Sequence, residues 1–76
     1  MTASRYIYGN LRLEMVRKGV TYQDLADALG VRHGTISDKM NGKSDFWYHE
    51  AAKIRDTFFP ECSLEYLFAR TDEISA

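Results

Sequence analysis

The sequence predicts a small all-α protein that forms one domain of five helices. Three observations support this prediction. Apolar residues recur every three or four positions in several segments, glycines or the single proline follow those segments, and no segment alternates apolar and polar residues as a half-buried strand does. The length of 76 residues suits one domain, and 45% hydrophobic with 28% charged residues is typical of a globular protein.

The first helix is expected from about Tyr8 to Lys18. Ile7, Leu11 and Met15 recur every four residues and therefore form a stripe that faces the core. Gly19 follows at the position where helices commonly end in a left-handed residue.

The second helix is expected from about Tyr22 to Leu29. Thr21 is a good N-cap, and Asp24 three residues later completes a capping-box pattern. Gly30 ends the helix, and its inner face consists of Leu25, Ala26 and Leu29.

The third helix is expected from about His33 to Asn41, before Gly42 stops it. Ile36 and Met40 are its inward pair, four residues apart. We expect Val31 and Ile36 to fill the angle between the second and third helices.

The fourth helix is expected from about Trp47 to Phe58. It ends at Phe59 because the residue before Pro60 avoids helical geometry. Its apolar stripe has spacings of four, three and four and consists of Trp47, Ala51, Ile54 and Phe58.

The fifth helix is short, from about Leu64 to Ala69, with Ser63 as its N-cap. Its apolar side consists of Leu64, Leu67 and Phe68. The domain is expected to include residues 1–76, with a packed core over about 7–69 and a frayed tail over 70–76.

The charge is distributed unevenly along the chain, although the formal net charge is only −1. Residues 1–43 hold seven Lys or Arg against four Asp or Glu, whereas residues 44–76 hold three against seven. Binding to phosphates requires local positive charge and not a positive total, so this balance is compatible with nucleic-acid binding.

The segment from Thr21 to Lys43 carries the clearest functional signal. Two helices of about eight residues are joined by a turn of about three residues around Gly30, which is typical of DNA-binding helix-turn-helix units. The third helix has an outer face without a large apolar residue, and such a helix suits the DNA major groove. This face consists of Arg32, His33, Gly34, Ser37, Asp38 and Asn41.

This segment resembles phage Cro and repressor-type helix-turn-helix regulators of the XRE family. The resemblance covers about residues 7–69. It rests chiefly on Leu25-Ala26, Leu29-Gly30-Val31, Thr35-Ile36-Ser37 and Asn41-Gly42-Lys43. It implies a compact lambda-repressor-like domain, in which the second and third helices form the helix-turn-helix.

The resemblance also implies the residues that meet double-stranded DNA. The positions at which relatives read base edges are occupied by Arg32, His33, Gly34, Ser37 and Asp38. The positions expected to contact phosphates are occupied by Tyr22, Gln23, Thr35, Lys39, Asn41, Lys43 and Ser44. For His33 the alternative is an exposed histidine with no special role, and for Asp38 it is a solvated carboxylate.

Two departures from the family pattern stand out. Relatives commonly carry an Arg on the first helix that pairs with a Glu near the end of the third, and these positions are Met15 and Met40 here. An apolar contact can replace that ion pair without leaving a buried unpaired charge. Relatives also N-cap the third helix with Ser or Thr, whereas this chain has Arg32, which cannot accept a backbone hydrogen bond. Gly34 weakens the first turn further.

Other functional classes receive less support. His33, Ser37 and Asp38 share one exposed helix, so they cannot form a water-excluding catalytic triad. His33, His49 and Cys62 lack metal-ligand spacing. Phe46-Trp47-Tyr48 could stack on single strands, but core packing is the favoured interpretation because Trp47 belongs to an apolar stripe. We therefore expect no enzyme activity, cofactor or metal.

The function expected from the sequence is sequence-specific duplex-DNA binding by a homodimeric transcriptional regulator, such as a Cro-like protein or small repressor. The alternative is a protein-interaction module, antirepressor or antitoxin-like, that keeps the fold. The single Cys62 rules out an internal disulfide, and the chain has no long apolar run. We therefore expect a cytoplasmic protein with no membrane segment and no small-molecule ligand.

Overall fold

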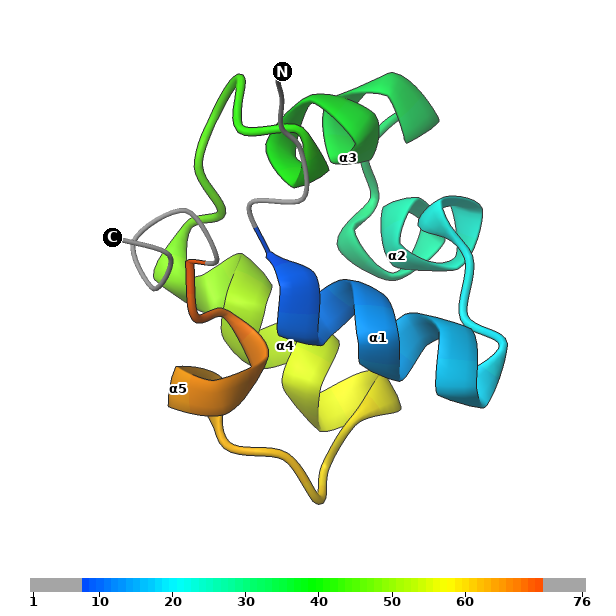
Figure 1. Ribbon diagram of the computed structural model, residues 1–76. Helices are drawn as coiled ribbons and strands as arrows, with labels where there is room; N and C mark the ends of the chain where they lie inside the picture. Colours follow the sequence, from blue (N-terminus) through cyan, green and yellow to red (C-terminus); the bar gives the residue numbers. More distant parts are fainter. Residues whose placement is uncertain (1–7, 71–76) are drawn as a thin grey trace.

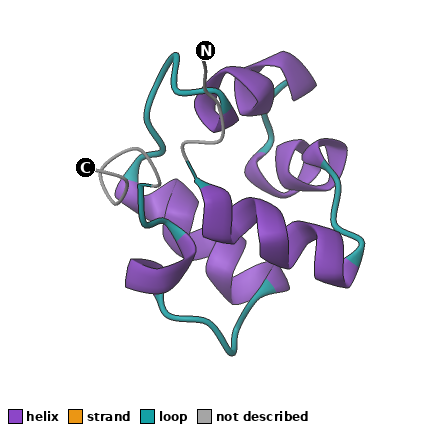
Figure 2. Cartoon of the chain, in the orientation of Figure 1, coloured by secondary structure: helices purple, strands orange, loops and turns teal. Residues whose placement is uncertain are grey.

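The computed structural model describes residues 8–70, and over this range it contains five helices and no strand, as predicted. The helices are α1 (Gly9–Lys18), α2 (Tyr22–Leu29), α3 (His33–Met40), α4 (Tyr48–Phe58) and α5 (Leu64–Leu67). In Figure 1, α3 lies at one end of the molecule and α5 lies toward the opposite end. Figure 2 shows the loops that connect the helices.

The predicted helix starts have the expected caps. The Asp24 N–H donates to Thr21 Oγ1 at 3.1 Å, and the Thr21 N–H donates to Asp24 Oδ2 at 2.9 Å, which closes the capping box of α2. Ser63 Oγ accepts from the Tyr66 N–H at 3.1 Å at the start of α5. Gly30 ends α2 with a φ of 71°, a conformation that L-residues with a Cβ adopt at a cost.

The core lies where all five helices converge. Ala26 is fully buried, and α2 packs against both α3 and α4, while α5 packs against α1 and α4. Val31 is half-buried against this core and Ile36 is fully buried, as expected, and Cys62 is half-buried against the same core. The fully buried large side chains are Leu11, Leu25, Ile36, Ile54, Phe59 and Leu67.

The expected place of Trp47 in the core is wrong. Its side chain is 67% exposed, because Trp47 is the extended N-cap residue of α4 and does not follow the helical periodicity of Ala51 and Ile54. Phe46 packs inward instead, with its ring centroid 5.4 Å from that of Tyr8 and 5.3 Å from that of Phe68.

Arg70, the first residue of the predicted frayed tail, contacts the rest of the domain. Arg70 Nη1 lies 3.4 Å from Asp45 Oδ1, and its guanidinium lies over the Tyr8 ring at 5.9 Å from the centroid. Arg70 is therefore tied to the loop before α4. Ile7 and the remainder of the predicted tail lie outside the described residues.

Candidate nucleic-acid interface

Helix α3 is buried on one side and polar on the other. Ile36 is fully buried and Met40 is 3% exposed, so both hold the helix against the core. The opposite side presents the residues predicted to read bases: Arg32, His33, Gly34 and Asp38 are exposed, and Ser37 is half-buried. The structure therefore brings these five residues together at one end of the molecule (Figure 1).

The start of α3 lacks a cap, as predicted. Arg32 occupies the N-cap position in an extended conformation, and its side chain makes no capping hydrogen bond. Arg32 forms no ion pair with any other residue in the range 8–70. The packing around α3 does not require a glycine at position 34, because a Cβ added there would meet no atom within 4 Å. The domain's own packing thus does not explain either residue.

Tyr22 connects the start of α2 to the exposed face of α3. The centroid of its half-buried ring lies 5.8 Å from that of His33. Arg12 Nη1 donates to the Tyr22 hydroxyl at 2.8 Å, which adds a positive group from α1. Sequence reasoning missed Arg12, because nothing in its local pattern shows that the start of α2 folds back onto the middle of α1.

The exposed Gln23 lies one residue further along α2, but its side chain is directed along the helix. Gln23 Nε2 donates to Asp27 Oδ1 at 2.8 Å. Contact with a phosphate requires this amide to leave its present partner or to use a second donor hydrogen.

The loop after α3 holds three of the predicted phosphate contacts, Asn41, Lys43 and Ser44, and all three are exposed. Its beginning is a Schellman-type turn: the Gly42 N–H donates to the Lys39 carbonyl at 3.2 Å, and the Lys43 N–H donates to the Asp38 carbonyl at 2.8 Å. Thr35 is half-buried in the first turns of α3.

The prediction that Lys39 contacts phosphate requires correction. The residue is only 6% exposed, and its Nζ donates to the Asp45 carbonyl at 2.8 Å. The same Nζ lies 3.3 Å from Glu50 Oε1. Lys39 lies on the side of α3 that also carries Ile36 and Met40. Its ammonium group therefore interacts with Asp45 and Glu50 inside the domain and is not presented on the polar face.

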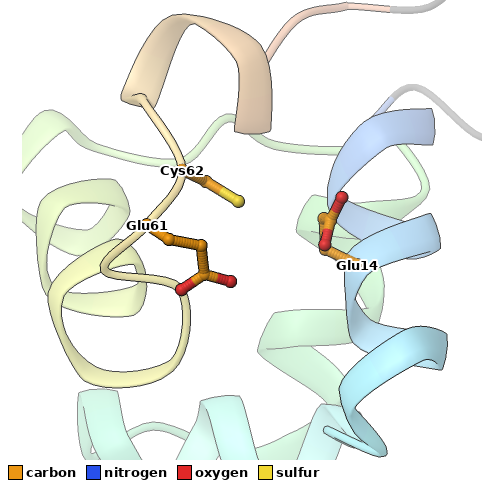
Figure 3. A group of neighbouring side chains, drawn as sticks. All are labelled: Glu14, Glu61 and Cys62. Atoms are coloured by element: carbon orange, nitrogen blue, oxygen red, sulfur yellow. The ribbon is translucent and has the colours of Figure 1, made fainter.

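A second group of titratable side chains lies between α1 and the loop that joins α4 to α5 (Figure 3). One ligand atom each from Glu14, Glu61 and Cys62 lies within 4.8 Å of the others, a spacing that could hold a metal ion. The two carboxylates already have protein partners. Glu14 Oε2 accepts from the Tyr66 hydroxyl at 2.8 Å, and Glu61 pairs with Lys18.

The contacts around this cluster shift the pKa values of Tyr66, Cys62 and Glu61. The hydrogen bond to Glu14, together with burial, raises the pKa of Tyr66, and burial beside Glu14 and Glu61 raises the pKa of Cys62. The hydrogen bond from Lys18 lowers the pKa of Glu61. A raised thiol pKa leaves Cys62 protonated at neutral pH, which disfavours its use as a nucleophile or metal ligand.

Comparison of the chain with protein-family models, curated proteins and solved structures gives no match. Within residues 8–70, no helix combines the length and apolar character needed to cross a bilayer.

Proposed function

We propose that the protein binds duplex DNA in a sequence-specific manner as a helix-turn-helix transcriptional regulator. The observation that carries this proposal is the two-sided character of α3. Ile36 and Met40 hold one side of the helix rigidly against the core, and the other side presents only polar groups. A rigid helix with a polar outer face fits the major groove, which admits one helix.

The surroundings of α3 support the same proposal. Arg32 lies at the N-cap position of α3 without making a capping hydrogen bond, and the exposed Lys43 lies just after the end of the helix. Neither forms an ion pair with a residue in the described range. In a groove-binding helix, a positive group at its start can reach a base edge, and a positive group just after its end can contact the phosphate backbone that borders the groove. A regulator of this type binds as a homodimer on a two-fold site with half-sites about one helical turn apart.

The experiment that tests this proposal is selection from a pool of random duplexes. A sequence-specific regulator should enrich one defined site, and the logarithm of its affinity should fall linearly with the logarithm of salt concentration. Sedimentation of the selected complex then gives the number of protein chains on each duplex. Failure to enrich any site at low salt would refute DNA recognition.

A protein-interaction module of the antirepressor or antitoxin type is the second candidate function. It is favoured by two adjacent aromatic residues at the start of α4, because Trp47 is 67% exposed and Tyr48 is 78% exposed. Exposed aromatic residues are common in the centres of protein interfaces. Replacing both with serine should leave duplex selection unchanged if this surface serves a protein partner, and should weaken it if the surface touches DNA.

A further inference from the structure

Within residues 8–70, Lys39 and Glu14 are the two buried charged residues. The Lys39 side chain is 7% exposed, and lysine is almost never buried to this extent unless it is paired. The partner is Glu50, whose side chain is 13% exposed and whose Oε1 lies 3.3 Å from Lys39 Nζ. The pair therefore connects the last turn of α3 to the first turn of α4.

The same two side chains also hold the backbone between the helices. Lys39 Nζ donates to the Asp45 carbonyl at 2.8 Å, and Glu50 Oε1 accepts from the Trp47 N–H at 2.9 Å. Lys39 Nζ lies 5.8 Å from the centroid of the Phe46 ring, within the range of a cation–π contact. We call this set of contacts among Lys39, Glu50 and residues 45–47 the Lys39 clamp.

The clamp is one of the contacts that anchor the loop after α3, beside the packing of Phe46 on Tyr8 and Phe68. The Schellman-type turn fixes the loop as far as Lys43, and the clamp fixes it again from Asp45. Ser44 alone lies between these two anchored points. A loop held at both ends presents Lys43 and Ser44 in one arrangement relative to the polar face of α3, so it loses little conformational entropy when it contacts a partner.

We infer that the Lys39–Glu50 pair is a positioning device that holds Lys43 and Ser44 in place to contact the DNA backbone. This inference rests on the proposed function. A buried ion pair is weak as a source of stability, since apolar residues of similar volume often replace such pairs at little cost. The pair supplies what apolar residues cannot supply, which is a donor directed at the Asp45 carbonyl.

The test compares the wild-type protein with Lys39→Met/Glu50→Gln. This variant keeps the net charge and keeps an amide oxygen that can accept from the Trp47 N–H, but it removes the donor to Asp45. The matched control is Arg55→Met/Asp56→Asn, which also leaves the net charge unchanged. It removes an ion pair on the outer part of α4, where Arg55 Nε lies 2.6 Å from Asp56 Oδ1. Thermal melts establish that both variants fold.

The first readout does not depend on DNA. We expect backbone NMR order parameters at Ser44 and Asp45 to fall from about 0.85 toward about 0.6 in the clamp variant, and to stay unchanged in the control. Unchanged order parameters in the clamp variant would show that the loop is held by other means and would overturn the inference.

The second readout uses the duplex selected from the random pool. Lys43→Ala should reduce the slope of log affinity against log salt by about 0.9, which corresponds to one phosphate contact. The clamp variant should reduce the slope by a similar amount, and combining it with Lys43→Ala should cause little further loss. A role in stability alone would leave the slope unchanged, and fully additive losses would overturn the positioning role.

The two readouts separate the two proposals. A protein that selects no duplex refutes the proposed function and the positioning role together, whatever the order parameters show. A protein that selects a duplex, but whose loop order and salt slope are insensitive to the clamp variant, refutes the positioning role alone.

Discussion

Replacement of Gly34 by alanine should stabilise the domain and change its affinity for DNA. Gly34 lies in the first turn of α3, and an added Cβ would meet no atom within 4 Å. The methyl group therefore causes no clash, while it lowers the conformational entropy of the unfolded chain. Substitutions of this kind stabilise proteins by about 0.4–1 kcal/mol. For a domain of this size, that corresponds to a rise in Tm of about 2–8 °C.

Gly30→Ala is the matched control, because the added atom is the same and again meets nothing within 4 Å. The backbone differs, since Gly30 has a φ of 71°. A left-handed conformation costs a residue with a Cβ about 1–2 kcal/mol, so this variant should lower the Tm. Thermal melts followed by circular dichroism should thus move in opposite directions for the two variants.

The affinity of Gly34→Ala for the selected duplex distinguishes two roles of the glycine. If Gly34 permits close approach of the backbone to DNA, the methyl group should weaken binding about tenfold, or by about 1.4 kcal/mol. If Gly34 keeps the start of α3 loose until DNA orders it, the more rigid helix should bind more tightly. A variant with an unchanged Tm would refute the helical argument, and one with unchanged affinity would refute both roles.

Three further predictions concern Arg32, the Met15–Met40 pair and Tyr66. Arg32→Ala should weaken binding to the selected site by about 1–3 kcal/mol in a gel-shift titration while leaving helicity intact, and unchanged affinity would refute the argument from the missing cap. Met15 is 4% exposed and Met40 is 3% exposed in one cluster, so Met15→Arg should lower the free energy of unfolding by about 3–5 kcal/mol. Adding Met40→Glu should recover about 0.5–3 kcal/mol of that loss, whereas simple additivity in urea denaturation would contradict the proposed contact. Tyr66 has a pKa above its ordinary value of 10.0, so its stabilising contribution is present below about pH 10 and is lost as the pH rises through the folded-state pKa. Urea denaturation between about pH 9 and about pH 11 should therefore show a smaller alkaline loss of stability in Tyr66→Phe than in the wild type, and an equal loss would count against the Tyr66–Glu14 hydrogen bond.

The alkaline loss should not vanish in Tyr66→Phe, because two other groups have the same sign. Burial raises the pKa of Tyr8 and that of Cys62. Each of these groups holds its proton more tightly in the folded protein than in the unfolded chain, so each contributes stability that high pH removes.

Errors of the sequence-based predictions concentrate at the junction of α3 and α4. The periodicity of the fourth segment placed Trp47 in the core, whereas the extended N-cap backbone turns this side chain outward and lets Phe46 pack inward. A spacing rule holds only within a helix, so it does not give the direction of the side chain at an N-cap residue, whose backbone is extended.

Lys39 and Arg12 show a second kind of error. A lysine in a helix that is predicted to bind DNA favours a phosphate contact on residue type alone, whereas its half-buried partner Glu50 lies eleven residues away on another helix. The residues next to Arg12 in the sequence predicted no functional role for it, yet its side chain donates to the Tyr22 hydroxyl. Long flexible side chains reach several partners, so their direction depends on packing that sequence spacing does not contain.

The sequence by itself determined the helices and their ends, because these depend on interactions between residues three or four positions apart. Thr21 with Asp24, Gly30 at a left-handed position, and the stripe of Leu25 and Ala26 are such local signals. The polar character of the outer face of α3 was also readable, because it repeats with the helical period. Only the tertiary structure decided which charges remain on that face. Lys39 turns inward to Glu50 while Arg32 stays exposed, because Lys39 has a half-buried acidic partner across the α3–α4 junction and Arg32 has no ion-pair partner in residues 8–70.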